Sequence, residues 1–290
     1  MTEGRALSRL AGASLVAALC ALPACDGTTG NLVTHESNAA GAGAGGDVGT
    51  GGSTLVQENW QIQLTGTLDT SLDVEVYEAD LFALDPASVR AVHDPGHTLH
   101  CYVSVGTAEP WRADYDALPA AAIGNAVADY PQESWLDVRD AAVLGVMEAR
   151  LTQAASIGCD GVELSNLSVH SADSGFPLTL SDERDYGQAL IAACHARGLT
   201  AGISASDDLV PLLADAADWG LTEECLAYDS CGAWQAVTRL AKPVFMIEYG
   251  SSNDAPALCP EAATLGFSLV IKRRALDAFR VGCPAMSANP

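Results

Sequence analysis

Hydrophobic and polar positions alternate in blocks along the chain from residue 58 onward. Eight short apolar runs, each of the length of a β-strand, are separated by longer stretches of mixed character. The runs are 60–66, 73–82, 98–106, 158–166, 199–206, 219–225, 243–250 and 265–273. Several of them combine apolar with small residues and end on polar ones, which is typical of parallel strands buried on both faces.

Two of the intervening stretches have helical spacing. In 143–157, apolar residues recur every three or four positions, and in 180–198 we expect Ser181 to be the N-cap and Gly198 to stop the helix. Strands alternating with helices predict an α/β fold, a (β/α)8 TIM barrel that forms one folded domain over 58–290. A doubly wound open sheet is the alternative, although no G-x-G-x-x-G motif follows a strand.

The first 24 residues have the pattern of an export signal. Arg5 and Arg9 precede an apolar run, 10–24, that is too short to span a membrane comfortably as a helix. The run ends in "LPAC", which resembles the lipobox of bacterial lipoproteins and implies that Cys25 is lipidated. We therefore expect an exported protein anchored in a membrane, at the cell surface or in the periplasm. Simple cleavage after "LPA", which would give a secreted protein, is the alternative.

Residues 25–57 have the composition of a linker. The stretch 37–54 is rich in Gly, Ala and Ser and contains no aromatic residue. Such a segment cannot bury much apolar area, so we expect a flexible tether between the lipidated cysteine and the folded domain.

The overall charge limits the choice of partner. The chain has 37 Asp and Glu against 14 Lys and Arg, a net charge of −23. Nucleic acid is excluded as a partner, because binding its phosphates requires basic patches. A cationic substrate would be attracted electrostatically, although acidity that only keeps the protein soluble is the alternative reading.

Nine cysteines indicate an oxidising compartment. Cys225 and Cys231 are close enough in sequence to close a short loop, and Cys259 could join Cys283. Cys101 lies in an apolar run, and we expect it to be a buried free thiol. Cys-x5-Cys without a second Cys or His pair is poor spacing for zinc. We expect neither a metal nor a cofactor.

In a (β/α)8 barrel the chemistry lies at the carboxyl ends of the strands. The polar residues expected there are Ser104, Glu109, Arg112, 163–166, 204–208, Glu223, Glu224, Glu248, Tyr249 and Lys272.

Five segments in order resemble glycoside hydrolase family 114. They are 100–115, 133–140, 158–163, 220–231 and 242–250, and the resemblance covers roughly 58–284. It implies a (β/α)8 barrel with endo-α-1,4-polygalactosaminidase activity. The implied substrate is a polysaccharide rich in galactosamine, a polycation that matches the acidity of the chain.

The resemblance also implies the catalytic groups. Glycoside hydrolysis normally uses two carboxyl groups. In the family one follows the fourth strand in a D-G-V-E-P-D-N pattern, and the other follows the sixth strand in N-E-Q-C. The second is Glu223 in "TEEC", but the first falls on Ser165 in "DGVELSN". A serine carries no charge at neutral pH, so it cannot replace a carboxylate.

Further departures from the family pattern occur at the same end of the barrel. They are Ser204–Ala205 in place of Lys-Asn, Thr222 in place of Asn, and Ser168 in place of Asp. Positions that support the fold remain, namely Trp135, Asp137, Arg150, Asp160, Tyr186 and His195. We expect the substrate-binding residues to be Trp60, Tyr102, Ser104, Glu109, Arg112, Ser165, Asn166, Glu248, Tyr249 and Lys272.

Two hypotheses follow. In the first, the protein is an active hydrolase in which Glu223 is the acid and Glu163, or else Glu248, supplies the second carboxylate. Glu163 could instead be an interior charge paired with a cation such as Lys272. In the second, the protein binds a cationic glycan without cleaving it, and Trp60, Tyr102, Trp111 and Tyr249 are stacking platforms. A serine hydrolase is disfavoured, because no G-x-S-x-G elbow is present.

Overall fold

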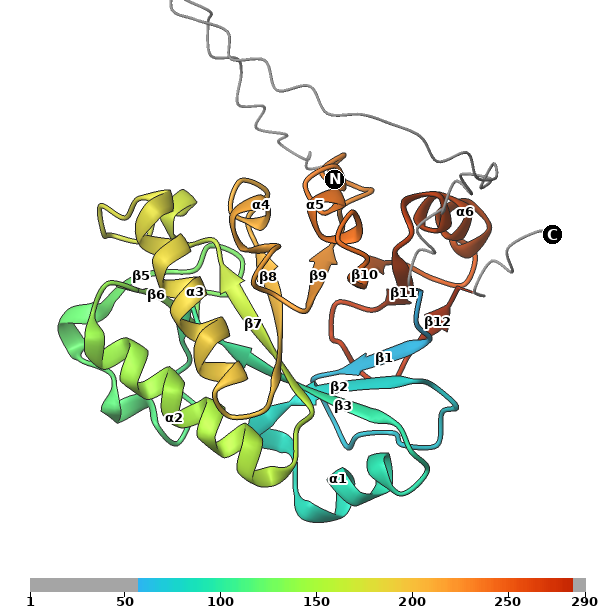
Figure 1. Cartoon of the computed structure of the whole chain (residues 1–290), viewed down its shortest axis with the longest axis horizontal. Helices are drawn as coiled ribbons and strands as arrows, with labels where there is room; N and C mark the ends of the chain where they lie inside the picture. The colour runs from blue at the N-terminus through green and yellow to red at the C-terminus, as the bar shows by residue number, and fades with distance from the viewer. Residues whose placement is uncertain (1–56, 284–290) are drawn as a thin grey trace, which may run out of the picture. The chain divides into compact units, whose positions relative to one another are not determined.

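A computed structural model describes residues 57–283, which fold around one sheet of mostly parallel strands (Figure 1). Its eight parallel strands follow one another in chain order, and a short antiparallel strand ends the sheet. The parallel strands are β1 (Trp60–Gln63), β2 (Val76–Asp80), β3 (Thr98–Ser104), β7 (Gly161–Leu167), β8 (Thr200–Ala205), β9 (Trp219–Glu223), β10 (Val244–Tyr249) and β11 (Ser268–Lys272), and the antiparallel strand is β12 (Val281–Gly282). The expected export signal, Cys25 and the tether up to residue 56 lie outside the described residues.

The helices lie around the outside of the sheet (Figure 1). They are α1 (Pro86–His93), α2 (Ala141–Ile157), α3 (Leu180–His195), α4 (Val210–Leu213), α5 (Gln235–Thr238) and α6 (Ala255–Leu265). Four single 3-10 turns are η1 (Leu81–Ala83), η2 (Tyr115–Ala117), η3 (Ala120–Ala122) and η4 (Val169–Ser171). Within residues 57–283, no helix has both the length and the apolar character needed to cross a membrane.

The strand order confirms the predicted (β/α)8 barrel. Each of the eight apolar runs contains one parallel strand, and the first and last strands approach each other. Trp60 Nε1 donates to the carbonyl oxygen of Ser268 at 2.6 Å, and Glu58 N donates to the Ser268 hydroxyl at 2.8 Å. The barrel is therefore nearly closed. It departs from the ideal pattern between β1 and β2, where residues 64–75 contain no helix.

Large apolar side chains fill the interior of the barrel. They are Trp60, Ile62, Val76, Trp219, Leu221, Phe245, Ile247 and Val270. Gly202 makes room for one of them, because a Cβ at this position would lie 2.3 Å from the Trp219 ring. His100 stacks on the same indole with ring centroids 4.3 Å apart. Burial lowers the pKa of His100 to about 4, so this histidine is a neutral core residue at neutral pH.

The two predicted helices are present, with different ends. For α3 the N-cap is Thr179 rather than Ser181. The Thr179 hydroxyl accepts from Asp182 N at 3.2 Å, and the Asp182 carboxylate accepts from Thr179 N at 2.8 Å. This reciprocal capping box satisfies two backbone donors, which Ser181 inside the first turn could not do. Gly198, with φ of +75°, lies just beyond the end of α3.

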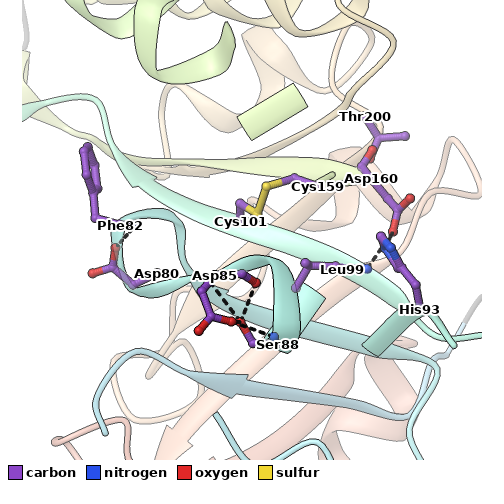
Figure 2. Close-up of a disulfide and its surroundings, with 10 residues drawn as sticks. All are labelled: Asp80, Phe82, Asp85, Ser88, His93, Leu99, Cys101, Cys159, Asp160 and Thr200. Atoms are coloured by element: carbon purple, nitrogen blue, oxygen red, sulfur yellow. Dashed lines mark hydrogen bonds and ion pairs between the residues drawn. A yellow bond between two sulfur atoms is a disulfide. The ribbon is translucent and has the colours of Figure 1, made fainter. Parts of the chain in front are cut away.

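The described cysteines form three disulfides and leave one free thiol. Cys225–Cys231 and Cys259–Cys283 confirm the predicted pairs. The expectation for Cys101 was wrong: it is bonded to Cys159, and the buried free cysteine is Cys194. Cys101 lies on β3 and Cys159 directly precedes β7, so the pairing of these two strands brings together sulfurs that are 58 residues apart (Figure 2).

A second, antiparallel sheet is inserted between β3 and α2. It consists of β4 (Thr107–Ala108), β6 (Ser134–Leu136) and β5 (Ile123–Ala126), in that order. Its first strand begins three residues after β3 ends, so the insertion starts at the carboxyl end of the barrel. The insertion therefore adds side chains to the end of the barrel where strand-terminal polar residues gather.

Candidate active site

A pocket with a volume of about 320 Å³ opens at the carboxyl ends of the barrel strands. Seven of the predicted site residues line it, from β3, β7, β9 and β10 and from the segment after β4. They are Tyr102, Glu109, Arg112, Ser165, Asn166, Glu223 and Tyr249. Trp111, expected as a stacking residue, is at its rim with 53% of its surface exposed. Most of the predicted site residues therefore gather at one end of the barrel.

Five predicted residues do not line this pocket, namely Ser104, Glu163, Trp60, Glu248 and Lys272. Trp60 is 1% exposed, packs against Phe245 in the core and lies at the opposite end of β1. Glu248 alternates with Tyr249 along β10, so it faces out of the barrel and accepts from Leu226 N at 2.9 Å. Lys272 is fully buried beneath the following loop.

Lys272 does not form the ion pair with Glu163 that the sequence suggested. Its Nζ donates to Gln61 Oε1 at 3.1 Å and to the Asp277 carbonyl oxygen at 2.8 Å. Burial lowers the pKa of Lys272 to about 8. Glu163 is an interior residue as expected, but residues 57–283 contain no ion pair between it and Lys272, so the expected pairing was wrong.

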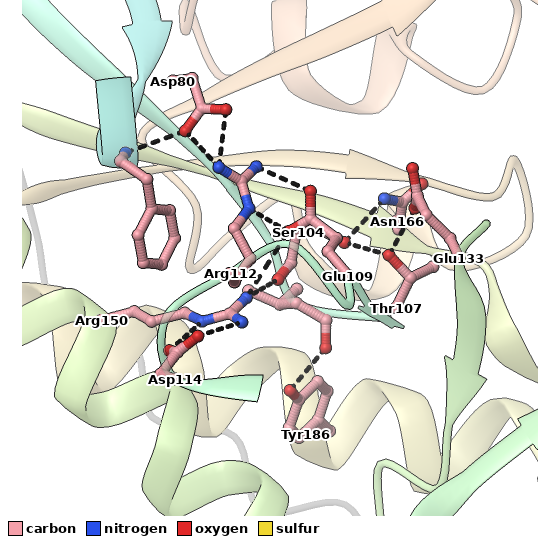
Figure 3. Close-up of polar contacts among 12 residues, drawn as sticks. Asp80, Ser104, Thr107, Glu109, Arg112, Asp114, Glu133, Arg150, Asn166 and Tyr186 are labelled. Carbon is pink, nitrogen blue, oxygen red and sulfur yellow. Dashed lines mark hydrogen bonds and ion pairs between the residues drawn. The ribbon is translucent and has the colours of Figure 1, made fainter. Parts of the chain in front are cut away.

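One wall of the pocket is a buried ion-pair network centred on Arg112 (Figure 3). Its Nε and Nη2 donate to the two oxygens of Glu109 at 2.8 and 2.7 Å, and its Nη1 donates to both oxygens of Asp80 at 2.8 Å. Burial disfavours the charge of Arg112, but the two carboxylates outweigh burial and raise the pKa of Arg112. Asp80 also accepts from Phe82 N at 2.9 Å, which fixes the end of β2.

A second buried arginine supports that wall from below. Arg150 on α2 is 1% exposed and donates to the two oxygens of Asp114 at 2.8 and 3.0 Å. Its Nη1 donates to the Ser104 carbonyl oxygen at 2.9 Å, at the end of β3. Tyr186 on α3 donates to the next carbonyl, that of Val105, at 2.8 Å (Figure 3). These contacts tie two outer helices to the loop that begins the insertion.

Glu223 ends β9, and its side chain is exposed to the pocket. The Tyr249 hydroxyl donates a short hydrogen bond to Glu223 Oε2. Protein atoms surround the remaining sides of the carboxyl group, and this desolvation raises the pKa of Glu223, with Tyr249 opposing the rise and Glu163 adding to it. Glu223 therefore keeps its proton to a higher pH than a free glutamic acid.

Ser165 occupies the floor of the pocket, next to the end of β3. Its register partner across the parallel pair is Ser104. The following residue, Asn166, has a φ of +64°, in the left-handed region. This conformation points Asn166 Nδ2 at the Ser104 hydroxyl, at 2.9 Å. Gly106 permits the close approach, because a Cβ there would lie 1.9 Å from the Asn166 carbonyl oxygen.

Glu163 lies beneath the pocket rather than in its wall. It is 2% exposed, faces the interior two residues before Ser165, and approaches the fully buried Glu78 of β2. No donor among residues 57–283 reaches either oxygen of Glu78. Burial raises the pKa of both carboxyl groups; Glu163 raises the pKa of Glu78 further, whereas the contact with Glu78 lowers the pKa of Glu163. The Glu78–Glu163 pair therefore retains a proton and lacks direct access to substrate.

Four titratable residues of the pocket lining were not singled out from the sequence. They are Asp80, Tyr130, Glu133 and Arg274. Asp80 was recognisable as the last polar residue of the second apolar run. Glu133 stood in a segment that carries the family resemblance, but no pattern placed it in a pocket. Tyr130 and Arg274 lie in loops, whose positions depend on the folded chain.

The pocket has an excess of negative charge. Its lining contains four acidic residues, Asp80, Glu109, Glu133 and Glu223, against two basic ones, Arg112 and Arg274. Arg112 is already neutralised by two carboxylates, and Arg274 pairs with Glu224 outside the lining at 2.6 Å. The remaining acidic groups can therefore attract a cationic ligand. Within residues 57–283 no cluster of three or more His, Cys, Asp or Glu has the arrangement of a metal site.

Comparisons with known proteins agree with this geometry. A family model described as glycoside-hydrolase family GH114 matches residues 47–287. The crystal structure of Aspergillus fumigatus Ega3 in complex with galactosamine is 31% identical, with 82% of this chain and 100% of that chain covered and a TM-score of 0.75. The glycoside hydrolase domain of PelA from Pseudomonas aeruginosa is 18% identical, with 77% and 97% covered and a TM-score of 0.60, and so shares the fold. A search of curated proteins found no match.

Proposed function

Because the chain belongs to glycoside hydrolase family GH114, we propose that it is a hydrolase of galactosamine-containing polysaccharide, of the endo-α-1,4-polygalactosaminidase type. Two findings support this substrate. The similar protein Ega3 has been crystallised with galactosamine, and the pocket of this chain carries an excess of carboxylates. A polymer of protonated amino sugars would be attracted to such a pocket.

The observation that carries the proposal is the environment of Glu223. This carboxyl group opens onto the pocket, and desolvation raises its pKa. A general acid must hold a proton at the working pH and lie within reach of the glycosidic oxygen. We assign Glu223 as the acid that protonates the leaving oxygen when the bond to the anomeric carbon breaks.

Ser165 supports a second candidate, a homologue that binds the polymer without cleaving it. The floor of the pocket has a hydroxyl where the family resemblance places a carboxylate. Release of reducing ends from partly deacetylated α-1,4-galactosamine polymer distinguishes the two functions. We expect release by the purified full chain. Binding by calorimetry without any release would show that the chain is a binding protein.

Two exposed aromatic side chains extend the pocket outward. Trp111 and Tyr130 are 53% and 57% exposed, and both also line a neighbouring groove with Asp129 and Glu133. Aromatic faces next to carboxylates suit an aminated sugar, which can stack and place its ammonium group over the ring. We expect Trp111→Ala to raise KM for long polymer about tenfold with little change in kcat. An unchanged KM would mean that the bound polymer does not contact Trp111.

The hydrogen bond from Tyr249 should set the alkaline limit of activity. Hydrolysis needs protonated Glu223, so kcat/KM should fall as the pH rises through its raised pKa. Tyr249→Phe removes a donor that favours the ionised form, so the pKa of Glu223 should rise further. We expect the alkaline limb to move to higher pH, measured from about pH 4 to about pH 9. If the alkaline limb of Tyr249→Phe coincides with that of the wild type, a group other than Glu223 controls it.

The proposal includes an exported protein that is anchored in a membrane by lipid on Cys25. The apolar run 10–24 and the ending "LPAC" support it. Expression of the full chain in a bacterium fed with labelled palmitate should give a labelled, membrane-bound protein. Cys25→Ala should lose the label. A labelled Cys25→Ala variant, or an unlabelled wild type, would contradict lipidation.

A further inference from the structure

Glycoside hydrolysis normally requires two carboxyl groups, and so far only Glu223 has been assigned in the pocket. Ser165 cannot be charged, and Glu163 is buried beneath it in a proton-holding pair with Glu78. In the pocket, Asp80 and Glu109 are both held by Arg112. Among the pocket carboxylates, Glu133 remains, and neither the family resemblance nor the strand ends assigned it a role.

Glu133 enters the pocket from the inserted sheet. It lies in the turn between β5 and β6, where Glu133 N donates to the Tyr130 carbonyl oxygen at 2.8 Å and Val127 N donates to the Glu133 carbonyl oxygen at 2.9 Å. The strand that follows pairs with β4, which begins just after the end of β3. The backbone of the turn is thus fixed to the end of the barrel, and the side chain is half-buried and lines the pocket.

A series of hydrogen bonds connects Glu133 with Asn166, the residue after Ser165 (Figure 3). Thr107 Oγ1 donates to Glu133 Oε2 at 2.7 Å, and Thr107 and Ser104 hydroxyls are 2.6 Å apart. Asn166 Nδ2 donates to Ser104 Oγ at 2.9 Å. Since each hydroxyl has one proton and that of Thr107 goes to Glu133, Ser104 must donate to Thr107. Every donor in the series therefore points toward the Glu133 carboxylate.

Because these hydrogen bonds all donate toward Glu133, they favour an ionised Glu133 carboxylate with one free oxygen. Oε2 accepts from Thr107, whereas Oε1 accepts no hydrogen bond from residues 57–283, and no cation of those residues lies within ion-pair distance. Burial raises the pKa of Glu133, while the Thr107 hydrogen bond opposes the rise. Adjacent strands are roughly 4.8 Å apart, so Ser104 and its partner Ser165 are neighbours on the pocket floor. Glu133, Ser165 and Glu223 line the same pocket of about 320 Å³, which is large enough to hold a water molecule.

We propose that Glu133 is the second catalytic carboxylate of this chain and acts as the general base in place of the missing strand-end aspartate. The inference rests on the proposed hydrolase function. Glu133 takes a proton from water while the water oxygen bonds to the anomeric carbon. The bond from that carbon to the bridging oxygen breaks, and the bridging oxygen takes the proton of Glu223. One water is consumed, and exchange with solvent restores both protonation states.

The test uses variants of the full chain on partly deacetylated α-1,4-galactosamine polymer. We expect Glu133→Gln to lower kcat about 10²- to 10³-fold with KM changed less than about threefold. The matched control, Glu261→Gln on the exposed surface of α6, should keep wild-type kcat and KM. Ser165→Asp in the Glu133→Gln background should recover at least about tenfold, because a carboxylate is returned to the family position.

Chemical rescue separates a base from a structural or binding residue. Glu133→Ala with sodium azide should release sugar again and give a β-configured glycosyl azide from the α-linked polymer. Wild-type kcat in Glu133→Gln would overturn the inference, as would a higher KM with unchanged kcat. So would a loss of activity that neither azide nor Ser165→Asp restores. If Glu133→Gln is active and Glu223→Gln is not, the proposed function stands and this inference falls. A wild type that releases nothing rejects both.

Discussion

Glu223→Gln should lower kcat for release of reducing ends by about 10³-fold. The amide has nearly the same shape as the carboxyl group and can still accept the hydrogen bond from Tyr249. It cannot give a proton to the leaving oxygen, so the loss should fall on the chemical step. Binding of the polymer, measured by calorimetry, and the melting temperature should stay close to wild type.

The neighbouring carboxylate provides a matched control for this substitution. Glu224 follows Glu223 in the chain but pairs with Arg274 and is not part of the pocket lining. Glu224→Gln should change kcat by less than about threefold. Full activity in Glu223→Gln would refute the assignment of the acid. An equal loss in both variants would attribute the effect to the loop rather than to proton transfer.

Arg150→Met should have the largest effect on stability, a loss of about 3–5 kcal/mol in the free energy of unfolding. The substitution leaves Asp114 without its bidentate partner and the Ser104 carbonyl without its donor. The loss also leaves buried Glu109, 3.9 Å from Arg150 and 3% exposed, with one cation fewer, whereas Asp114, 28% exposed, is partly compensated by solvent. For a domain of this size the loss corresponds to a melting temperature lowered by roughly 10 °C.

The same substitution at an exposed arginine serves as the control. Arg139 pairs with Asp137 at 2.8 Å on the surface, where water screens both charges. Arg139→Met should change the denaturation midpoint far less than Arg150→Met, measured by urea unfolding of both variants. Equal midpoints would mean that the buried network around Arg150 has no special role.

The strands could be recognised locally because burial on both faces gives each one a continuous apolar run. All eight runs contain a barrel strand, and Cys225–Cys231 followed from a short separation in sequence. The bond between Cys101 and Cys159 did not follow, since it depends on β3 lying beside β7. Pairing of strands that are distant in sequence is decided by the whole sheet.

For the site, the sequence by itself placed Glu223, Ser165 and Tyr249 at the carboxyl ends of the strands, where they line one pocket. Alternation along β10 already implied that Glu248 and Tyr249 face opposite sides. Only the tertiary structure decided what covers each strand end: a loop seals Lys272, whereas the inserted sheet brings Glu133 and Tyr130 over the pocket. The physical reason is that period-2 alternation fixes the face of a side chain, but its access to solvent depends on the packing of segments far away in sequence.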